Sequence, residues 1–236
     1  MNVHEVPFDK LNITNRDVLR EMGYGIKDAD SFVEQQIDLL LDDPASLVMS
    51  RFVYRIYSGK VEREVIWIGD TLLNVGSIIS SIMEGATAFA VFAATAGEHL
   101  EKVMKEAVTR NDVFEEYLVS AIGSCIVEKT GDYMENVLQA ELSVLSHTRR
   151  FSPGYCGWPL SDQKSIFHLL GDNPCNITLS ECFLMTPIKS ISGIIGIGEH
   201  VKRNLYGCAV CNMQSCYKRK KYTKYHKVGV LYQIVY

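Results

Sequence analysis

The chain has 236 residues, of which 47% are hydrophobic, and a formal net charge of −4. This is enough apolar material for one sizeable core, and the charge gives no reason to expect a nucleic-acid protein. A basic block at residues 218–227 and an acidic one at 26–43 occur without a recognised nucleic-acid-binding motif.

The most apolar stretch, residues 71–97, is interrupted by Asn74, Gly76, Glu84 and Gly85. A bilayer-spanning helix needs about 20 mainly apolar residues, so this stretch predicts a buried helix and strand instead. Residues 1–10 lack the basic and then apolar pattern of a secretory signal. We therefore expect a cytoplasmic protein without a membrane partner.

Helical spacing of apolar residues predicts helices over 15–23 and 28–43. Residues 51–69 are rich in β-branched and aromatic residues and predict a hairpin that turns at Ser58-Gly59-Lys60. Asn111-Asp112 can cap a long helix reaching about residue 143. Strands are predicted again at 177–186 and 190–197. Because helices and strands do not alternate strictly, the pattern favours one α+β domain with a largely antiparallel sheet and flanking helices.

The segment Arg150-Phe-Ser152-Pro-Gly154-Tyr155 combines an arginine, a turn and an aromatic ring. Pro-Gly marks a turn and lets a ligand approach the main chain closely. Arginine can bind a carboxylate with two parallel hydrogen bonds, and the tyrosine face can stack on a base or attract a cation. These groups suit a zwitterion, although an ordinary surface turn with a solvated arginine has the same residues.

The segment resembles the Arg-x-x-x-Gly-Tyr loop in the activation domain of cobalamin-dependent methionine synthase, which holds S-adenosylmethionine. Similarity continues in order through residues 163–170, 177–187 and 190–195, and more weakly through 88–97 and 121–128. It is strongest over 85–207, so we expect an activation-like domain at 1–207 and a basic, cysteine-containing tail at 208–236. Residues 1–60 show no convincing similarity.

The resemblance implies a set of S-adenosylmethionine-binding residues: Glu128, Arg150, Ser152, Gly154, Tyr155 and Tyr206. In this set Arg150 meets the carboxylate and Glu128 the ammonium, and Tyr206 is a loose match. From the helical pattern alone, Glu128 could instead be a solvated residue at the helix flank. No catalytic acid or base is expected, because the implied role is positioning during reductive methylation of cob(II)alamin.

Cys208, Cys211 and Cys216 are three closely spaced thiols near the C-terminus. Together with a fourth ligand they could bind zinc or an iron-sulfur cluster, and Cys156, Cys175, His200 and His226 are all conceivable partners. Reduced free thiols and a redox switch are the alternatives, whereas structural disulfides are disfavoured in a cytoplasmic chain. The methionine synthase domain lacks this cluster, so it is a departure from the family.

None of the six histidines has an aspartate two residues before it, so the corrinoid signature Asp-x-His-x-x-Gly is missing. Cobalamin is therefore expected from a partner, either a cobalamin-dependent methionine synthase or another corrinoid protein, with flavodoxin or ferredoxin as the electron donor. On this reading the chain is a methyltransferase component that is not active alone. The other hypotheses are a reactivator of a different corrinoid methyltransferase and a metal or iron-sulfur electron-transfer adaptor.

Overall fold

The computed structural model describes residues 2–24, 29–42, 49–142 and 144–203. Its α-helices are α1 (Asn15–Glu21), α2 (Ser31–Asp42), α3 (Gly76–Ile82), α4 (Glu98–Thr109), α5 (Val113–Leu142) and α6 (Gln163–Leu170). Its strands are β1 (His4–Glu5), β2 (Arg51–Glu62), β3 (Val65–Ile68), β4 (Thr71–Leu73), β5 (Ala88–Thr95), β6 (Ser146–His147), β7 (Thr178–Leu179), β8 (Met185–Thr186) and β9 (Ser190–Gly198). Short 3-10 helices cover Phe8–Leu11, Leu160–Asp162 and Pro174–Asn176.

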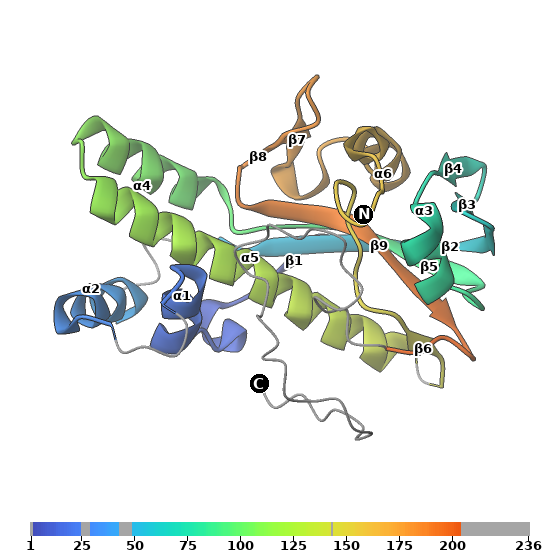
Figure 1. The fold of residues 1–236 in the computed structure, drawn as a ribbon, viewed down its shortest axis with the longest axis horizontal. Coiled ribbons are helices and arrows are strands. Elements are labelled where there is room, and N and C mark those ends of the chain that lie inside the picture. The colour runs from blue at the N-terminus through green and yellow to red at the C-terminus, as the bar shows by residue number, and fades with distance from the viewer. Residues whose placement is uncertain (1, 25–28, 43–48, 143, 204–236) are drawn as a thin grey trace, which may run out of the picture.

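One antiparallel sheet forms the centre of the molecule, with strand order β4-β3-β2-β5-β9-β6 and β1 added to the start of β2 (Figure 1). Strands β5 and β9 pair along their whole length, from Ala88 opposite Ile197 to Thr95 opposite Ser190. The predicted α+β class with a largely antiparallel sheet is thus confirmed.

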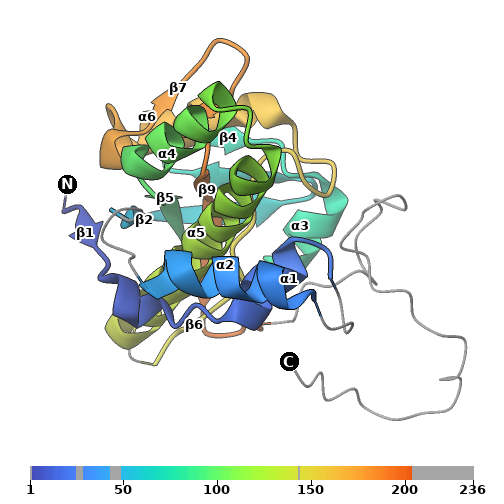
Figure 2. The ribbon, with the colours of Figure 1, turned by 90° about the vertical axis from the view of Figure 1, so that its left-hand side faces the viewer.

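Helices cover both faces of this sheet (Figures 1 and 2). Alternation along β5 explains why: Phe89, Val91 and Ala93 belong to the core beneath α3 and α6, while Ala90 and Phe92 belong to the core beneath α5. Side chains alternate between the two faces of a strand, so a strand buried on both faces is apolar throughout. Residues 88–95 accordingly read as a continuous apolar run.

Helix α5 is the longest element and lies along one face of the sheet, with α1 packed against it (Figure 2). Its start is capped as expected, because Asp112 Oδ1 accepts a hydrogen bond from Glu115 N at 2.9 Å. Its apolar residues pack on β2, β5 and β9. The helix therefore brings its C-terminal half beside β9 and β6.

The hairpin at 51–69 is present, but the predicted turn is wrong. Strand β2 runs through Ser58-Gly59-Lys60, and the chain reverses at Arg63 and Glu64. Gly59 is needed for close packing, because a Cβ there would lie 2.3 Å from Trp67 O. Glycine is also common in turns, so the local sequence does not distinguish the two roles.

The predicted continuous strand at 177–186 is also wrong. The chain forms a two-stranded hairpin there, β7 with β8, and Phe183 in its connection has a left-handed φ of 63°. The strand predicted at 190–197 is confirmed as β9, and the helix predicted at 28–43 is described only from α2 at Ser31 to Asp42.

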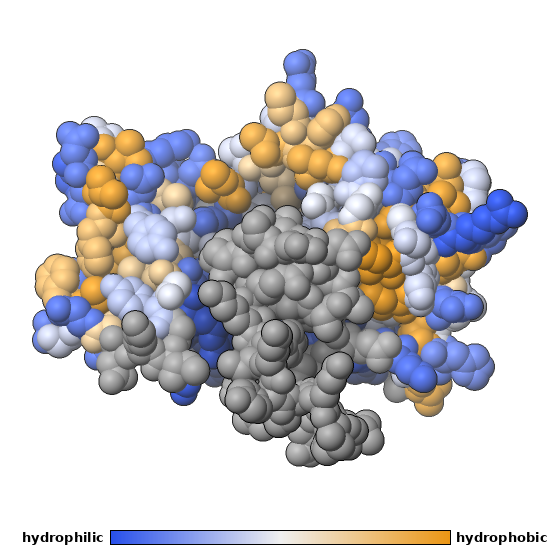
Figure 3. Space-filling view, in the orientation of Figure 1, coloured by the Kyte–Doolittle hydropathy of each residue, from blue (hydrophilic) through white to orange (hydrophobic). Residues whose placement is uncertain are grey.

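Exposed apolar side chains gather where α2, α4 and α5 meet at one end of the molecule (Figure 3). Val113 is 74% exposed and Phe32 55%. This apolar patch surrounds the start of α5 at Val113, whereas the C-terminal half of the helix, beside β9 and β6, lies away from it. Over the residues that the structure describes, none of the helices is long and apolar enough to span a membrane.

Candidate functional site

The segment that follows α5 runs beside β9 and turns alternate side chains to opposite faces. Ser146 and His147 pair with Gly198 and Ile197, and Phe151 exchanges two backbone hydrogen bonds with Ile194, at 3.0 and 2.9 Å. Gly193 permits this approach, since a Cβ there would lie 1.9 Å from Phe151 O. Phe151 enters the core beneath α6, which leaves its neighbour Arg150 directed at α5.

Arg150 lies against α5 and contacts three of its carboxylates. Nη1 donates to Asp132 Oδ1 and Glu135 Oε1, both at 2.8 Å. Nη2 donates to the Glu128 carboxylate at 2.6 Å and to the Glu128 backbone carbonyl at 3.1 Å. Residues 128, 132 and 135 share one stripe of the helix because they are spaced i, i+4 and i+7. Without the arginine, these carboxylates would repel one another.

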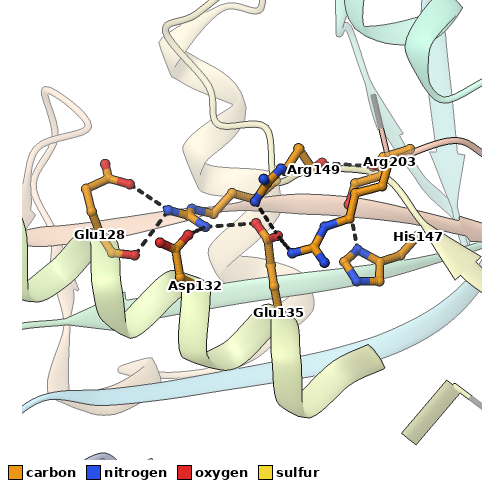
Figure 4. Close-up of polar contacts among 8 residues, drawn as sticks. Glu128, Asp132, Glu135, His147, Arg149 and Arg203 are labelled. Atoms are coloured by element: carbon orange, nitrogen blue, oxygen red, sulfur yellow. Dashed lines mark hydrogen bonds and ion pairs between the residues drawn. The ribbon is translucent and has the colours of Figure 1, made fainter. Parts of the chain in front are cut away.

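Glu135 receives two further arginines (Figure 4). Its Oε2 accepts from Arg203 at 2.8 Å and from Arg149 at 3.3 Å, and its side chain has no exposed surface. Burial alone would raise the pKa of Glu135, but Arg150, Arg203 and Arg149 outweigh it and hold that pKa below its ordinary value. For Arg150, burial alone would lower the pKa, yet the carboxylates of Glu128, Asp132 and Glu135 raise it above its usual range. Both groups are therefore ionised at neutral pH.

His147 lies at the inner end of this network and is 1% exposed. Its Nδ1 donates to the Thr148 carbonyl at 2.7 Å, while Nε2 has no partner within the described residues. Burial lowers the pKa of His147, and the positive charges of Arg203 and Arg149 act in the same direction. The imidazole is therefore neutral at pH 7.

Beyond Arg150 the chain makes a tight loop. Gly154 has a φ of 92°, a left-handed conformation that favours glycine, and its N–H donates to Trp158 O at 2.8 Å. The Tyr155 ring is on the surface and 58% exposed, whereas Trp158 is 1% exposed in the core. The indole Nε1 donates to Asp162 Oδ2 at 2.9 Å, and the same oxygen accepts from Asn74 N at 2.8 Å. The loop therefore presents Gly154 and Tyr155 from a rigid base.

The structure brings together two of the predicted site residues by direct contact, Arg150 and Glu128, and it places Ser152, Gly154 and Tyr155 in the loop that follows Arg150. Tyr206 lies outside the described residues. Sequence reasoning missed Asp132, Glu135, Arg149 and Arg203. The acidic stripe on the helix and the Arg149-Arg150 pair were visible signals for three of them, whereas nothing local indicates that Arg203 contacts Glu135.

The predicted metal ligands Cys208, Cys211 and Cys216 also lie outside the described residues. Among the residues that the structure does describe, no group of three or more His, Cys, Asp or Glu side chains could hold a metal ion. Cys175 is buried there, and burial raises the pKa of its thiol to about 12. It is therefore a protonated thiol at neutral pH.

Comparison with known proteins identifies a family and a similar fold. The family model "Vitamin B12 dependent methionine synthase, activation domain" matches residues 78–222. A solved structure, "Crystal Structure of the MetH Reactivation Domain bound to AdoHcy", is similar with a TM-score of 0.62 and 18% sequence identity. The similarity covers 87% of this chain and 80% of that one, so the shared fold extends outside the family match. None of the curated proteins matches the chain.

The family match spans more than half of the chain and includes α5, the Arg150 loop and β9. The solved structure supports the same fold independently. The chain therefore belongs to the family of vitamin B12-dependent methionine synthase activation domains.

Proposed function

We propose that this chain binds S-adenosylmethionine at the Arg150–Tyr155 loop and serves as a reactivation module for a separate cobalamin-dependent methionine synthase. The observation that carries the proposal is the contact between Arg150 and Glu128, two opposite charges held at 2.6 Å beside an exposed loop. The similar reactivation domain bound to AdoHcy supports the ligand class. Family membership supports the role.

The Arg150–Glu128 pair suits the amino-acid end of the ligand. The Glu128 side chain is 57% exposed, so it can rotate without opening the core. A ligand carboxylate then takes its place on Arg150 Nη2, and Glu128 accepts from the ligand ammonium. One ion pair within the protein is thereby exchanged for two with the ligand, and charge-assisted hydrogen bonds of this kind are among the strongest in proteins.

The loop suits the rest of the ligand. The exposed ring of Tyr155 offers a face for the adenine. Gly154 has no side chain, and the nearest atom to a Cβ built there would be Leu160 Cδ1 at 3.5 Å, so a ligand can approach the main chain at this position. The half-buried Ser152 adds a hydroxyl beside them. Tyr206 completes the proposed set.

S-adenosylmethionine, when bound, supplies the methyl group for reductive methylation of cobalamin carried by the partner. The contribution of this chain is positioning: Arg150 and Glu128 fix the amino-acid end, and Tyr155 fixes the base. No side chain has to transfer a proton for this role. A flavodoxin or ferredoxin supplies the electron, and the complex forms in the cytoplasm.

Calorimetry with S-adenosylmethionine tests the binding site. Arg150→Ala should weaken binding by about 1.5–3 kcal/mol, the value of a hydrogen bond to a charged group. Arg51→Ala is the matched control, because Arg51 pairs with Glu5 in another part of the sheet and should leave the affinity unchanged. Equal affinities of wild type and a folded Arg150→Ala protein would refute the site.

A reconstituted assay tests the partner. We expect no methyl transfer from the isolated chain, and transfer once a cobalamin-loaded methionine synthase lacking its own activation domain and a reductant are both added. Omitting either addition should abolish the signal. Stoichiometric cobalamin on the chain purified by itself would contradict the requirement for a separate corrinoid protein.

A further inference from the structure

The three carboxylates that hold Arg150 differ in how freely they can leave it. Glu128 and Asp132 are 57% and 50% exposed, whereas the Glu135 side chain is completely buried. All four N–H bonds of the two Nη groups are already used by the three residues. A ligand carboxylate therefore has to displace an existing acceptor, and the exposed ones can turn into solvent at the lowest cost.

Glu135 is fixed from two sides. Its Oε1 accepts from Arg150 at 2.8 Å, and its Oε2 accepts from Arg203 at 2.8 Å and Arg149 at 3.3 Å. A buried carboxylate costs several kcal/mol to desolvate unless it is paired and hydrogen-bonded. With the three arginines in place, rotating Glu135 away from Arg150 would break this pairing without any access to water.

The backbone of α5 sets how closely the Arg150 guanidinium approaches the helix. A Cβ on Gly131 would lie 2.9 Å from Arg150 Cζ and 3.0 Å from its Nε, so the guanidinium rests directly on the helix. Gly131 thus sets the height of the group above α5, and Glu135 sets its position along the helix. Neither residue was singled out by the sequence, and neither has a place in the proposed ligand contacts.

We propose that Glu135 is a positioning residue, which keeps the Arg150 guanidinium in its binding orientation while the ligand replaces Glu128. This rests on the proposed function, since it assigns Arg150 the ligand carboxylate. Glu135 touches no ligand atom itself. Its effect on binding passes entirely through Arg150, and the Arg149 and Arg203 contacts keep it charged and immobile during the exchange.

The test uses Glu135→Gln, which retains size and removes the charge, with two readouts on the full-length chain. In ligand-free protein, NMR of the Arg150 guanidinium should show faster rotation of the Nη1 group, which loses the charged acceptor on Glu135 and keeps only Asp132. In calorimetry, S-adenosylmethionine affinity should fall about tenfold or more, as expected for losing a charge-assisted contact. Thr130→Val is the control, since Thr130 is equally buried on α5 but its hydroxyl donates only to the Ile126 carbonyl.

If Glu135→Gln does not fold, Glu135→Asp serves in its place, because it keeps the charge but withdraws the carboxylate by one methylene. It should loosen Arg150 and weaken binding in the same direction. A folded variant with wild-type affinity and a wild-type Arg150 spectrum overturns the proposal, whatever the stability of the protein. If the wild type fails to bind S-adenosylmethionine, the proposed function is refuted and the positioning role falls with it. If the wild type binds but the Glu135 variant keeps the wild-type Arg150 spectrum, only the role of Glu135 is refuted.

Discussion

The loop from Arg150 to Asp162 is held at its two ends by different chemistry. At the first end, Arg150 donates hydrogen bonds to carboxylates of α5, two of which are half-exposed. At the second, Trp158 is buried to 1% exposure and its indole is bound by Asp162. Charged contacts near solvent can be replaced by a ligand of matching charge, whereas a buried aromatic ring cannot leave without opening the core. The first end is thus suited to binding and the second to holding the loop.

The largest effect is expected from Trp158→Ala. Emptying this position should lower the free energy of unfolding by about 3–5 kcal/mol, the range for removing a large buried aromatic side chain. Urea denaturation measures the change. Tyr155→Ala is the matched aromatic control in the same loop, and its cost should stay within about 0.5 kcal/mol because the ring is on the surface. Similar costs for the two variants would show that the second end does not hold the loop.

A smaller effect is expected from Asp162→Ala, which leaves the Trp158 indole N–H and the Asn74 backbone N–H without their acceptor. An unsatisfied buried donor costs about 1–3 kcal/mol, so the loss in unfolding free energy should lie in that range. Asp172→Ala, at an exposed position nearby in sequence, is the control. Calorimetry should show a smaller loss of S-adenosylmethionine affinity than Arg150→Ala causes, which separates the two ends.

The smallest effect concerns pH at the charged end. Because the folded-state pKa of His147 is lowered, the unfolded chain binds a proton first as the pH falls. The contribution of His147 is therefore fully present above about pH 6.5 and is lost as the pH falls to its folded pKa. His147→Gln should flatten the dependence of the unfolding free energy on pH between 7 and 5, which urea denaturation at several pH values measures. The lowered pKa of Glu135 contributes stability that is fully present above about pH 4.3 and is lost only as the pH falls below that value.

Much of the fold could be predicted from the sequence wherever local patterns and tertiary contacts agree. Helix α5 has both a capping aspartate and a long apolar pattern, and β9 is a continuous run of small and β-branched residues. The errors arose where a residue serves a distant contact. Gly59 accommodates Trp67 O across the hairpin, and Phe183 reverses the chain between β7 and β8. Neither requirement is visible from neighbouring residues.

The candidate site shows the same contrast between residues that sequence patterns indicate and residues that they do not. Arg150 and Glu128 were identified through a resemblance that extends over several ordered motifs, and the structure joins them directly. Asp132 and Glu135 could have been found from helical spacing, since they follow Glu128 by four and seven residues. The contact from Arg203 to Glu135 spans 68 positions and depends on how β9 leaves the sheet. Long-range ion pairs of this kind leave no periodic signal in a single sequence.

The charges around Arg150 also sum to zero, with Arg149, Arg150 and Arg203 on one side and Glu128, Asp132 and Glu135 on the other. The amino-acid group of the proposed ligand is itself a neutral zwitterion. The proposed exchange would therefore leave the total charge unchanged, and the affinity should depend little on ionic strength. S-adenosylmethionine and its demethylated product are identical at that end and differ by one positive charge at sulfur. Under the proposed function, the network therefore binds both ligands equally well, and any preference for the methylated form has to be set by the groups that face the sulfur.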